Sequence, residues 1–312
     1  MPTDKKKTAE TLIDDIRELL TGVIEGNSVE VSDEYLAEFG SNVAIKLKDA
    51  LTARNKKVRK TKTLYMSEYG RPCRRQLWYD IRPEYKENKE DISSSNLIKF
   101  LYGDILEELV LALAELAGHE VTHQQHPCEL QLPNGWKLRG RMDAKIDGEI
   151  VDVKSTTSFG FQKFAKGTLA EDDPFGYISQ LGGYVEAEHP EGIPEGTKTS
   201  FIVIDKQLGH LCRMEMEASK DQDPIATSDE HLSLVMDLEA SEPPKRHWEE
   251  QPEGKSGNMK LPTGCAYCAY KQECWKDAND GKGLRTFIYS NGPKYLTKVA
   301  KEPNVVEAKD DI

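Results

Sequence analysis

The stretch GRMDAKIDGEIVDVK, residues 140–154, decides the fold, because it combines two strand patterns with a tight turn. From residue 136 to residue 146 apolar and polar side chains alternate, as in a strand with one buried face. The Asp-Gly pair at 147–148 is a strong hairpin signal. Residues 149–154 then continue as a second strand, so the stretch predicts an antiparallel hairpin.

The predicted hairpin gathers acidic side chains at one place. A period of two puts Asp152 and Lys154 on one face of the second strand, and a short hairpin brings Asp143 close to Asp152. Two neighbouring carboxylates are costly unless a cation holds them, and oxygen ligands suit Mg²⁺ or Mn²⁺. The alternative interpretation is a surface ion pair between Asp152 and Lys154 on an edge strand.

Helical and strand patterns alternate along the rest of the chain. Helices are predicted over residues 8–24, 33–51, 97–117, 174–188 and 227–240, and further strands over 199–205 and 209–217. Residues 241–260 have the composition of a polar linker, and residues 301–312 that of a flexible acidic tail. Helix, antiparallel strands, then helix and strand together predict an α+β fold.

The predicted helix over 97–117 carries a third acid for the hairpin site. Asp104, Glu108 and Glu115 share a polar stripe, whereas Glu107 falls among apolar positions and is expected to point inward. A carboxylate that points inward needs a partner, and a metal site would supply one. An ordinary salt-bridged helix acid is the alternative.

Composition and charge restrict the class of protein. The 312 residues include 42 basic and 54 acidic side chains, and the net charge of −12 argues against a uniformly basic nucleic-acid coat. No apolar stretch approaches the roughly 18 residues of a membrane span, and the N-terminus lacks the apolar region of a signal peptide. We therefore expect a cytoplasmic protein without a membrane partner.

Six cysteines in a chain of this size favour metal binding over a disulfide scaffold. Three cluster in GCAYCAYKQECW: Cys265, Cys268 and Cys274. A closed site of four thiolates needs one more, and Cys128 and Cys212 lie in segments typical of a core. Cys73 follows a proline and opens a predicted helix, where amide donors favour a thiolate. The local spacing alone leaves a zinc knuckle and a redox pair open.

These motifs in combination resemble the PD-(D/E)xK nuclease superfamily, specifically its RecB-like exonuclease branch. The hairpin supplies G-R-M-D and E-I-V-D-V-K, and Gln180 with Tyr184 matches the downstream Q-x-x-x-Y element. Gly103 with Glu107 matches the glutamate form of the upstream element, where many iron–sulfur members have histidine. The resemblance spans about residues 100–185.

The resemblance implies a restriction-endonuclease-like core, with a mixed central sheet flanked by helices and extra N-terminal helices. It assigns one or two divalent ions to four ligands: Glu107, Asp143, Asp152 and the backbone carbonyl of Val153. Lys154 would position or deprotonate the attacking water, and Gln180 and Tyr184 would orient the lysine or the substrate phosphate. We accordingly predict three regions: 1–62 helical, 63–300 the nuclease domain, and 301–312 the tail.

The position of the cysteines around this core matches the iron–sulfur subset of RecB-like nucleases. That subset includes the CRISPR-associated RecB-like exonuclease, AddB-type subunits and related phage exonucleases. It implies a [4Fe–4S] cluster on Cys73, Cys265, Cys268 and Cys274 that clasps the ends of the domain. Structural Zn²⁺ is the alternative, because four thiolates serve either metal.

A DNA path is predicted from basic residues that lie near the core in sequence. These are Lys56, Lys57, Arg59, Lys60, Arg74, Arg75, Arg139 and Arg141. A solvated helix end is the alternative for most of the run before residue 63.

The predicted activity is that of a metal-dependent DNA exonuclease, preferring single strands and, on resemblance alone, running from 5′ to 3′. A phage origin, with a role in DNA degradation, recombination or replication in the host cytoplasm, fits this activity. The amphipathic helix over 8–24 leaves a homo-oligomer open, and replication or recombination proteins remain candidate partners. The alternatives are a CRISPR-adaptation-type nuclease that works with a partner, a non-catalytic DNA-binding decoy and a zinc-bound RNA-interaction module.

Overall fold

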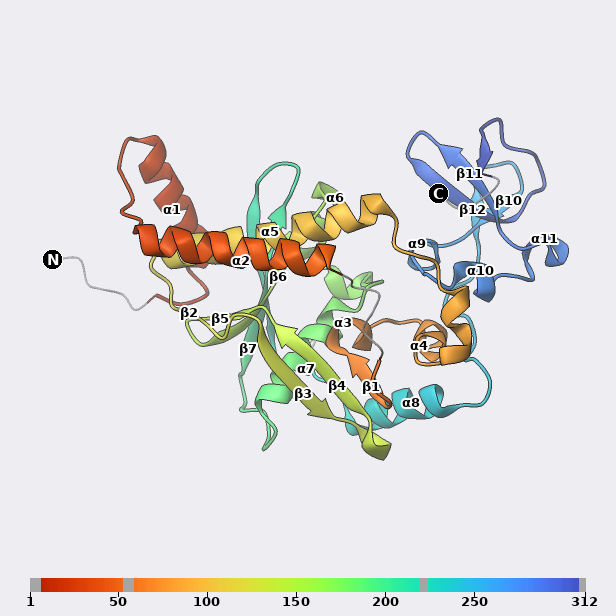
Figure 1. The fold of residues 1–312 in the computed structure, drawn as a ribbon, viewed down its shortest axis with the longest axis horizontal. Helices are drawn as coiled ribbons and strands as arrows, with labels where there is room; N and C mark the ends of the chain where they lie inside the picture. The colour runs from red at the N-terminus through yellow and green to blue at the C-terminus, as the bar shows by residue number, and fades with distance from the viewer. Residues whose placement is uncertain (1–6, 53–58, 219–223, 309–312) are drawn as a thin grey trace. The chain divides into compact units, whose positions relative to one another are not determined.

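The computed structural model describes residues 7–52, 59–218 and 224–308, and it confirms an α+β protein with mixed sheets. The chain divides into two compact units (Figure 1). The first unit comprises Met1–Gly70 and Ser95–Ser228, and the second comprises Arg71–Ser94 and Asp229–Ile312. The predicted division at residues 62 and 300 differs from this one, because the N-terminal segment belongs to the first unit and residues 71–94 group with the C-terminal part.

The central sheet of the first unit has the strand order β2-β5-β6-β7-β8. Its strands are β2 (Val121–Thr122), β5 (Ala144–Ile146), β6 (Glu149–Thr156), β7 (Lys198–Asp205) and β8 (Leu211–Glu217). β6 and β7 are parallel, and the other neighbours are antiparallel. The β5–β6 turn has positive φ at both Asp147 (51°) and Gly148 (86°), which confirms the predicted hairpin.

Helices pack against this sheet because its central strands are apolar on both faces. Ile202 and Ile204 of β7 share a hydrophobic cluster with α1 (Leu12–Ile24) and α5 (Ser94–Leu116). On the opposite face, Phe201 packs edge-to-face on Phe164 of α6 (Ser158–Ala165), and α7 (Tyr177–Glu188) contacts β6 and β7. The predicted helix over 8–24 is therefore part of the core, with Leu12 fully buried.

A second, three-stranded sheet in the first unit has the order β1-β4-β3. It contains β1 (Thr63–Tyr65), β3 (His126–Gln131) and β4 (Lys137–Met142), and it contacts α3 (Met66–Tyr69). The single strand predicted over 136–146 is thus divided at Asp143. β4 pairs with β3 before that residue, and β5 pairs with β6 after it. Asp143 consequently lies where the chain passes from one sheet to the other.

The remaining elements of the first unit are α2 and two short turns. α2 (Asp33–Leu51) has the predicted bounds, and the hydroxyl of Ser32 caps it by accepting from the backbone N–H of Tyr35. The 3₁₀ turns are η3 (Pro133–Gly135) and η4 (Leu169–Glu171).

The second unit contains a sheet that the sequence patterns did not predict. Its order is β13-β11-β12-β10-β9, formed by β9 (Gln251–Glu253), β10 (Asn258–Lys260), β11 (Arg285–Tyr289), β12 (Gly292–Lys298) and β13 (Glu307–Ala308). Its helices are α4 (Arg74–Asp80), η2 (Pro83–Asn88), α8 (Ser228–Glu239), α9 (Thr263–Ala266), α10 (Lys271–Cys274) and α11 (Ala278–Gly281).

Two predictions in this unit are wrong for identifiable reasons. The segment 241–260, predicted as a linker, contains β9 and β10. Within the predicted acidic tail, Glu302 and Glu307 both form ion pairs with Arg285, at 2.6 Å each. Composition alone could not show that Arg285 holds these two acids. Residues 309–312 lie outside the described residues.

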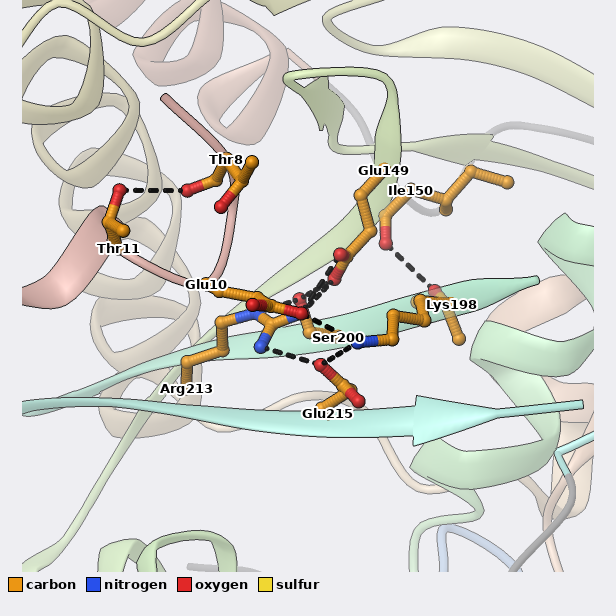
Figure 2. Close-up of polar contacts among 10 residues, drawn as sticks. Thr8, Glu10, Thr11, Glu149, Ile150, Lys198, Ser200, Arg213 and Glu215 are labelled. Carbon is orange, nitrogen blue, oxygen red and sulfur yellow. Dashed lines mark hydrogen bonds and ion pairs between the residues drawn. The ribbon is translucent and has the colours of Figure 1, made fainter. Parts of the chain in front are cut away.

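A polar network fastens the start of the chain and strands β6, β7 and β8 together (Figure 2). Arg213 donates from Nη2 to both carboxylate oxygens of Glu149, at 2.7 and 2.9 Å, and from Nη1 to Glu215 at 3.0 Å. The hydroxyl of Ser200 donates to Glu149 as well, at 2.5 Å. Lys198 reaches Glu10 at 2.6 Å. Figure 2 shows these side chains converging over the β6–β8 strands.

Within the described residues, no helix combines the length and the apolar character that crossing a membrane requires.

The packing of α7 gives a test of the fold. A Cβ on Gly182 would lie 1.8 Å from the backbone carbonyl oxygen of Pro224, whereas a Cβ on Gly40 of α2 would meet open space. We expect Gly182→Ala to lower the free energy of unfolding by about 1–3 kcal/mol, because backbone must move. Gly40→Ala should raise it by about 0.5–1 kcal/mol through helix propensity. Urea denaturation followed by circular dichroism measures both, and equal midpoints would contradict the packing.

Candidate active site and cysteine cluster

Asp143 and Asp152 meet at the edge of the central sheet, as predicted. Ala144 pairs with Val151 across the hairpin, so the preceding Asp143 lies beside Asp152. The backbone N–H of Val153 donates to Oδ2 of Asp143 at 2.8 Å. Asp152 is fully buried, and its Oδ1 accepts no hydrogen bond from the described part of the chain. A buried carboxylate oxygen without a hydrogen-bond partner is costly, and it can serve as a ligand for a cation.

Lys154 is the cation of this pair of acids. Its Nζ lies 2.5 Å from Oδ2 of Asp152, on the face of β6 that α7 covers. Burial alone would lower the pKa of Lys154, but the carboxylates of Asp152 and Asp143 raise it above the ordinary value. The lysine is therefore held as an ammonium ion.

The surroundings raise the pKa values of the two acids above their ordinary values. Burial, then the charges of Glu107 and Asp152, raises the pKa of Asp143 well above its ordinary value. Burial also raises the pKa of Asp152, although Lys154 opposes the shift. The three carboxylates therefore interact, and without further positive charge they resist being ionised together.

Glu107 points inward from α5, as the helical pattern predicted. Oε1 of this residue lies 2.8 Å from Nζ of Lys46 and accepts a hydrogen bond from Gln125 at 2.7 Å. The same lysine lies 2.9 Å from Oε1 of Glu108, whose side chain is only 7% exposed. The prediction that Glu108 belongs to an exposed polar stripe is therefore wrong, because α2 covers that side of α5.

Gln180 and Tyr184 lie together on α7, one turn apart. Nε2 of Gln180 donates to the hydroxyl of Tyr184 at 3.1 Å. Burial raises the pKa of Tyr184, and the charges of Asp152 and Asp143 raise it further, so its phenol faces the acids in the neutral form. Tyr177, on the same helix, places its ring centre 5.0 Å from Nζ of Lys154. No short sequence motif includes Tyr177, Lys46 or Gln125, so no local pattern pointed to them.

The predicted DNA-contacting residues are divided between the two units. Lys56 and Lys57 lie outside the described residues, and Arg74 and Arg75 belong to the second unit. Several of the others have internal partners: Arg59 pairs with Glu68 at 2.7 Å, Arg139 pairs with Glu129 at 2.6 Å, and Arg75 donates to the carbonyl oxygen of Pro244 at 3.0 Å. Lys60 and Arg141 are exposed in the first unit. The prediction of a DNA path therefore depends mainly on Lys60 and Arg141, and on Lys56 and Lys57, which lie outside the described residues.

The second unit brings together the four cysteines that the sequence selected. Cys73 precedes α4, and it lines one small cavity with Cys265, Cys268 and Cys274. Cys128 and Cys212 lie in strands β3 and β8 of the first unit. Tyr79 and Tyr270 stack beside the cavity with ring centres 5.4 Å apart, so the segments that carry the cysteines also share aromatic packing.

The surroundings of this cavity disfavour the thiolate form of Cys73, Cys265 and Cys268. Burial, with the charges of the neighbouring cysteines, raises the pKa of Cys265 and of Cys268 to about 12. Burial also raises the pKa of Cys73. A bound metal would reverse this balance, because it supplies the positive charge that thiolates need.

The donor sets fit their candidate cations in chemical kind. Four cysteines on one cavity suit an iron–sulfur cluster or zinc, and three carboxylates with an unpartnered oxygen suit Mg²⁺ or Mn²⁺. Across residues 7–52, 59–218 and 224–308, no group of three or more His, Cys, Asp or Glu side chains is already spaced to hold a metal ion. Side chains at both places would have to close in around a cation.

Comparison with known proteins adds little to these observations. No model of a protein family matches the chain, and no curated protein does either. One similar solved structure is titled "Crystal structure of SSO0001", with 21% sequence identity and a TM-score of 0.42; the match covers 74% of this chain and 93% of that chain.

The raised pKa of Asp143 gives a test by pH in the presence of EDTA. A carboxyl whose pKa is higher in the folded than in the unfolded protein lowers stability as pH rises between the two pKa values. We expect Asp143→Asn to be more stable than the wild type at pH 8, with the difference shrinking as pH falls toward 4. Urea midpoints at several pH values measure it. A constant difference would contradict an upward shift, and Asp172→Asn, on the exposed surface, is the control.

Proposed function

We propose that this chain is a divalent-metal-dependent deoxyribonuclease with a RecB-like PD-(D/E)xK core, acting as an exonuclease on single-stranded DNA. The observation that carries the proposal is the meeting of Asp143, Asp152 and Lys154 at one sheet edge, where Oδ1 of Asp152 is buried without a hydrogen-bond partner among the described residues. An ion pair between Asp152 and Lys154 with a purely structural role would not need a second carboxylate beside it. The inward Glu107 on α5 supports the same assignment.

The ligands of the divalent ion would be Glu107, Asp143, Asp152 and the carbonyl of Val153. When bound, such an ion activates water and stabilises charge on the phosphate oxygens. The backbone N–H of Val153 holds the carboxylate of Asp143 in a fixed orientation, which leaves one oxygen of that group for a ligand role.

Lys154 acts in this proposal through its charge. Because its pKa is raised, the ammonium form persists at neutral pH and stabilises developing negative charge on a phosphate. This favours the positioning role of the lysine over removal of a proton from water. Tyr177 and the Gln180–Tyr184 pair restrict where the ammonium can lie, since they occupy the α7 side of the site.

The catalytic proposal is tested with a matched pair of acid and lysine. Asp172 and Lys163 form an ion pair of 2.6 Å away from the proposed site and provide the control. We expect Asp152→Asn and Lys154→Met each to lower Mn²⁺-dependent cleavage of single-stranded DNA by about 100-fold or more, because each removes a charge that the reaction uses. Asp172→Asn and Lys163→Met should cleave like the wild type.

The assay uses oligonucleotides labelled at the 5′ or 3′ end, with each end free or blocked, in Mn²⁺ or EDTA. Mononucleotide release that requires a free 5′ end is the expected pattern. Wild-type protein that leaves all substrates intact with Mn²⁺ would contradict the nuclease proposal and favour a DNA-binding decoy.

For the cysteine cavity we propose a [4Fe–4S] cluster bound by Cys73, Cys265, Cys268 and Cys274. The supporting observation is that four of the six cysteines line one cavity although Cys73 is far from the others in sequence. Linking distant segments restrains the unfolded chain, so the cluster would stabilise the second unit.

Removal of one ligand distinguishes the cluster from zinc. We expect protein purified without oxygen to be brown and to contain iron, and Cys73→Ser to lose both the colour and a large part of its thermal stability. Cys212→Ser, in a strand of the first unit, should keep both. Colourless wild-type protein with one equivalent of zinc would overturn the iron–sulfur assignment and leave a structural zinc site.

A further inference from the structure

Lys46 lies at the candidate site, and neither a motif nor the proposed reaction explains its position. It projects from α2 and places its Nζ between two acids of α5, 2.8 Å from Glu107 and 2.9 Å from Glu108. Its side chain is only 15% exposed. Glu107 is the same residue that the proposed function assigns to a divalent ion.

We propose that Lys46 is an internal cation that competes with the divalent metal for Glu107, and that Glu108 receives the ammonium when the metal binds. This inference rests on the proposed function, because it needs Glu107 to be a metal ligand. An ammonium in direct contact with a ligand oxygen both occupies that oxygen and repels a divalent cation. Movement of Lys46 away from Glu107 would therefore favour metal binding.

Glu108 makes this movement inexpensive. It is buried and already lies within ion-pair distance of Lys46, so the ammonium can leave Glu107 without becoming unpaired. Gln125 donates to the same Oε1 of Glu107 and can keep the carboxylate oriented during the exchange. The two adjacent acids of α5 then have different roles, one for the metal and one for the lysine.

α2 is held to α5 in part by polar contacts, so movement of Lys46 between the two acids can affect its attachment. Of its described residues only Ala50 is classed as buried, while Leu36, Ile45, Leu47 and Leu51 are more than 40% exposed. A cavity of about 180 Å³, lined by Tyr35, Asn42 and Glu108 among others, lies between α2 and α5. Figure 1 shows α2 lying along α5. Polar contacts, including one of 2.6 Å from Tyr35 to Glu115, contribute much of its hold.

The first experiment measures Mn²⁺ affinity of the full-length protein by isothermal titration calorimetry, without DNA. We expect Lys46→Met to bind Mn²⁺ roughly tenfold more tightly than the wild type, a change of the size that neighbours of metal ligands produce. Lys46→Arg should stay close to the wild type, because it keeps the positive charge. Lys48→Met is the control: it removes an exposed lysine from the same helix with the same change in net charge.

A second variant tests the same contact without altering α2. Glu108→Gln should weaken Mn²⁺ binding, because Lys46 then has Glu107 as its only carboxylate partner of the two. In a Lys46→Met background the same substitution should have a smaller effect, and this coupling separates action through Lys46 from simple loss of a nearby charge. Circular dichroism verifies that each variant is folded.

The outcomes distinguish this inference from the proposed nuclease. Equal Mn²⁺ affinity in wild type, Lys46→Met and Lys48→Met, or weaker binding in Lys46→Met, overturns the competition even when DNA is cleaved. Tighter binding in Lys46→Met, abolished by adding Asp152→Asn, supports it even when DNA is not cleaved. If no variant binds Mn²⁺, both proposals fail.

Discussion

The burial of carboxylates beside the end of β5 is the constraint on which the rest of the site depends. Burial raises the pKa of Asp143, Asp152 and Glu107, and the charges of Glu107 and Asp152 raise the pKa of Asp143 further. Positive charge reaches them from β6 through Lys154 and from α2 through Lys46. The core that positions them is rigid by comparison: β6 and β7 are enclosed by helices on both faces. A stable scaffold thus maintains an arrangement that is unfavourable by itself, as expected where binding rather than stability determines the residues.

The change of sheet at Asp143 explains how the chain reaches this geometry. The strand pattern over 136–146 is continuous in sequence, yet β4 pairs in one sheet and β5 in the other. A residue between two ladders is free of strict cross-strand pairing, so its side chain can turn toward the backbone N–H of Val153. The local cost of breaking the strand is small, because its neighbours on both sides remain hydrogen-bonded. The break orients one carboxylate at the point where β6 presents another.

The sequence predicted those parts of this arrangement that depend on local periodicity. Period two placed Asp152 and Lys154 on one face, the Asp-Gly pair gave the hairpin, and the helical wheel turned Glu107 inward. It failed where distant segments decide the environment. Glu108 looked exposed because nothing in α5 shows that α2 will cover it. The short strands between residues 251 and 308 carry too few residues for a period to emerge, and the ion pairs of Arg285 with Glu302 and Glu307 join residues 17 and 22 positions apart. The identity of any bound metal is likewise not contained in a local pattern.

The attachment of α2 follows from the same electrostatics. A helix held by a broad apolar face responds little to a cation at one end of its contact, because burial energy is spread over many side chains. α2 instead exposes much of its apolar surface and offers one lysine to two acids. Its attachment to α5 therefore includes a charged contact that a divalent ion at Glu107 would change directly. α1 is instead attached through apolar side chains, with Leu12 and Ile16 fully buried in the core. Among the described residues, these two N-terminal helices are thus fastened differently: α1 by buried apolar side chains, and α2 in part by the contact of Lys46 with Glu107 and Glu108.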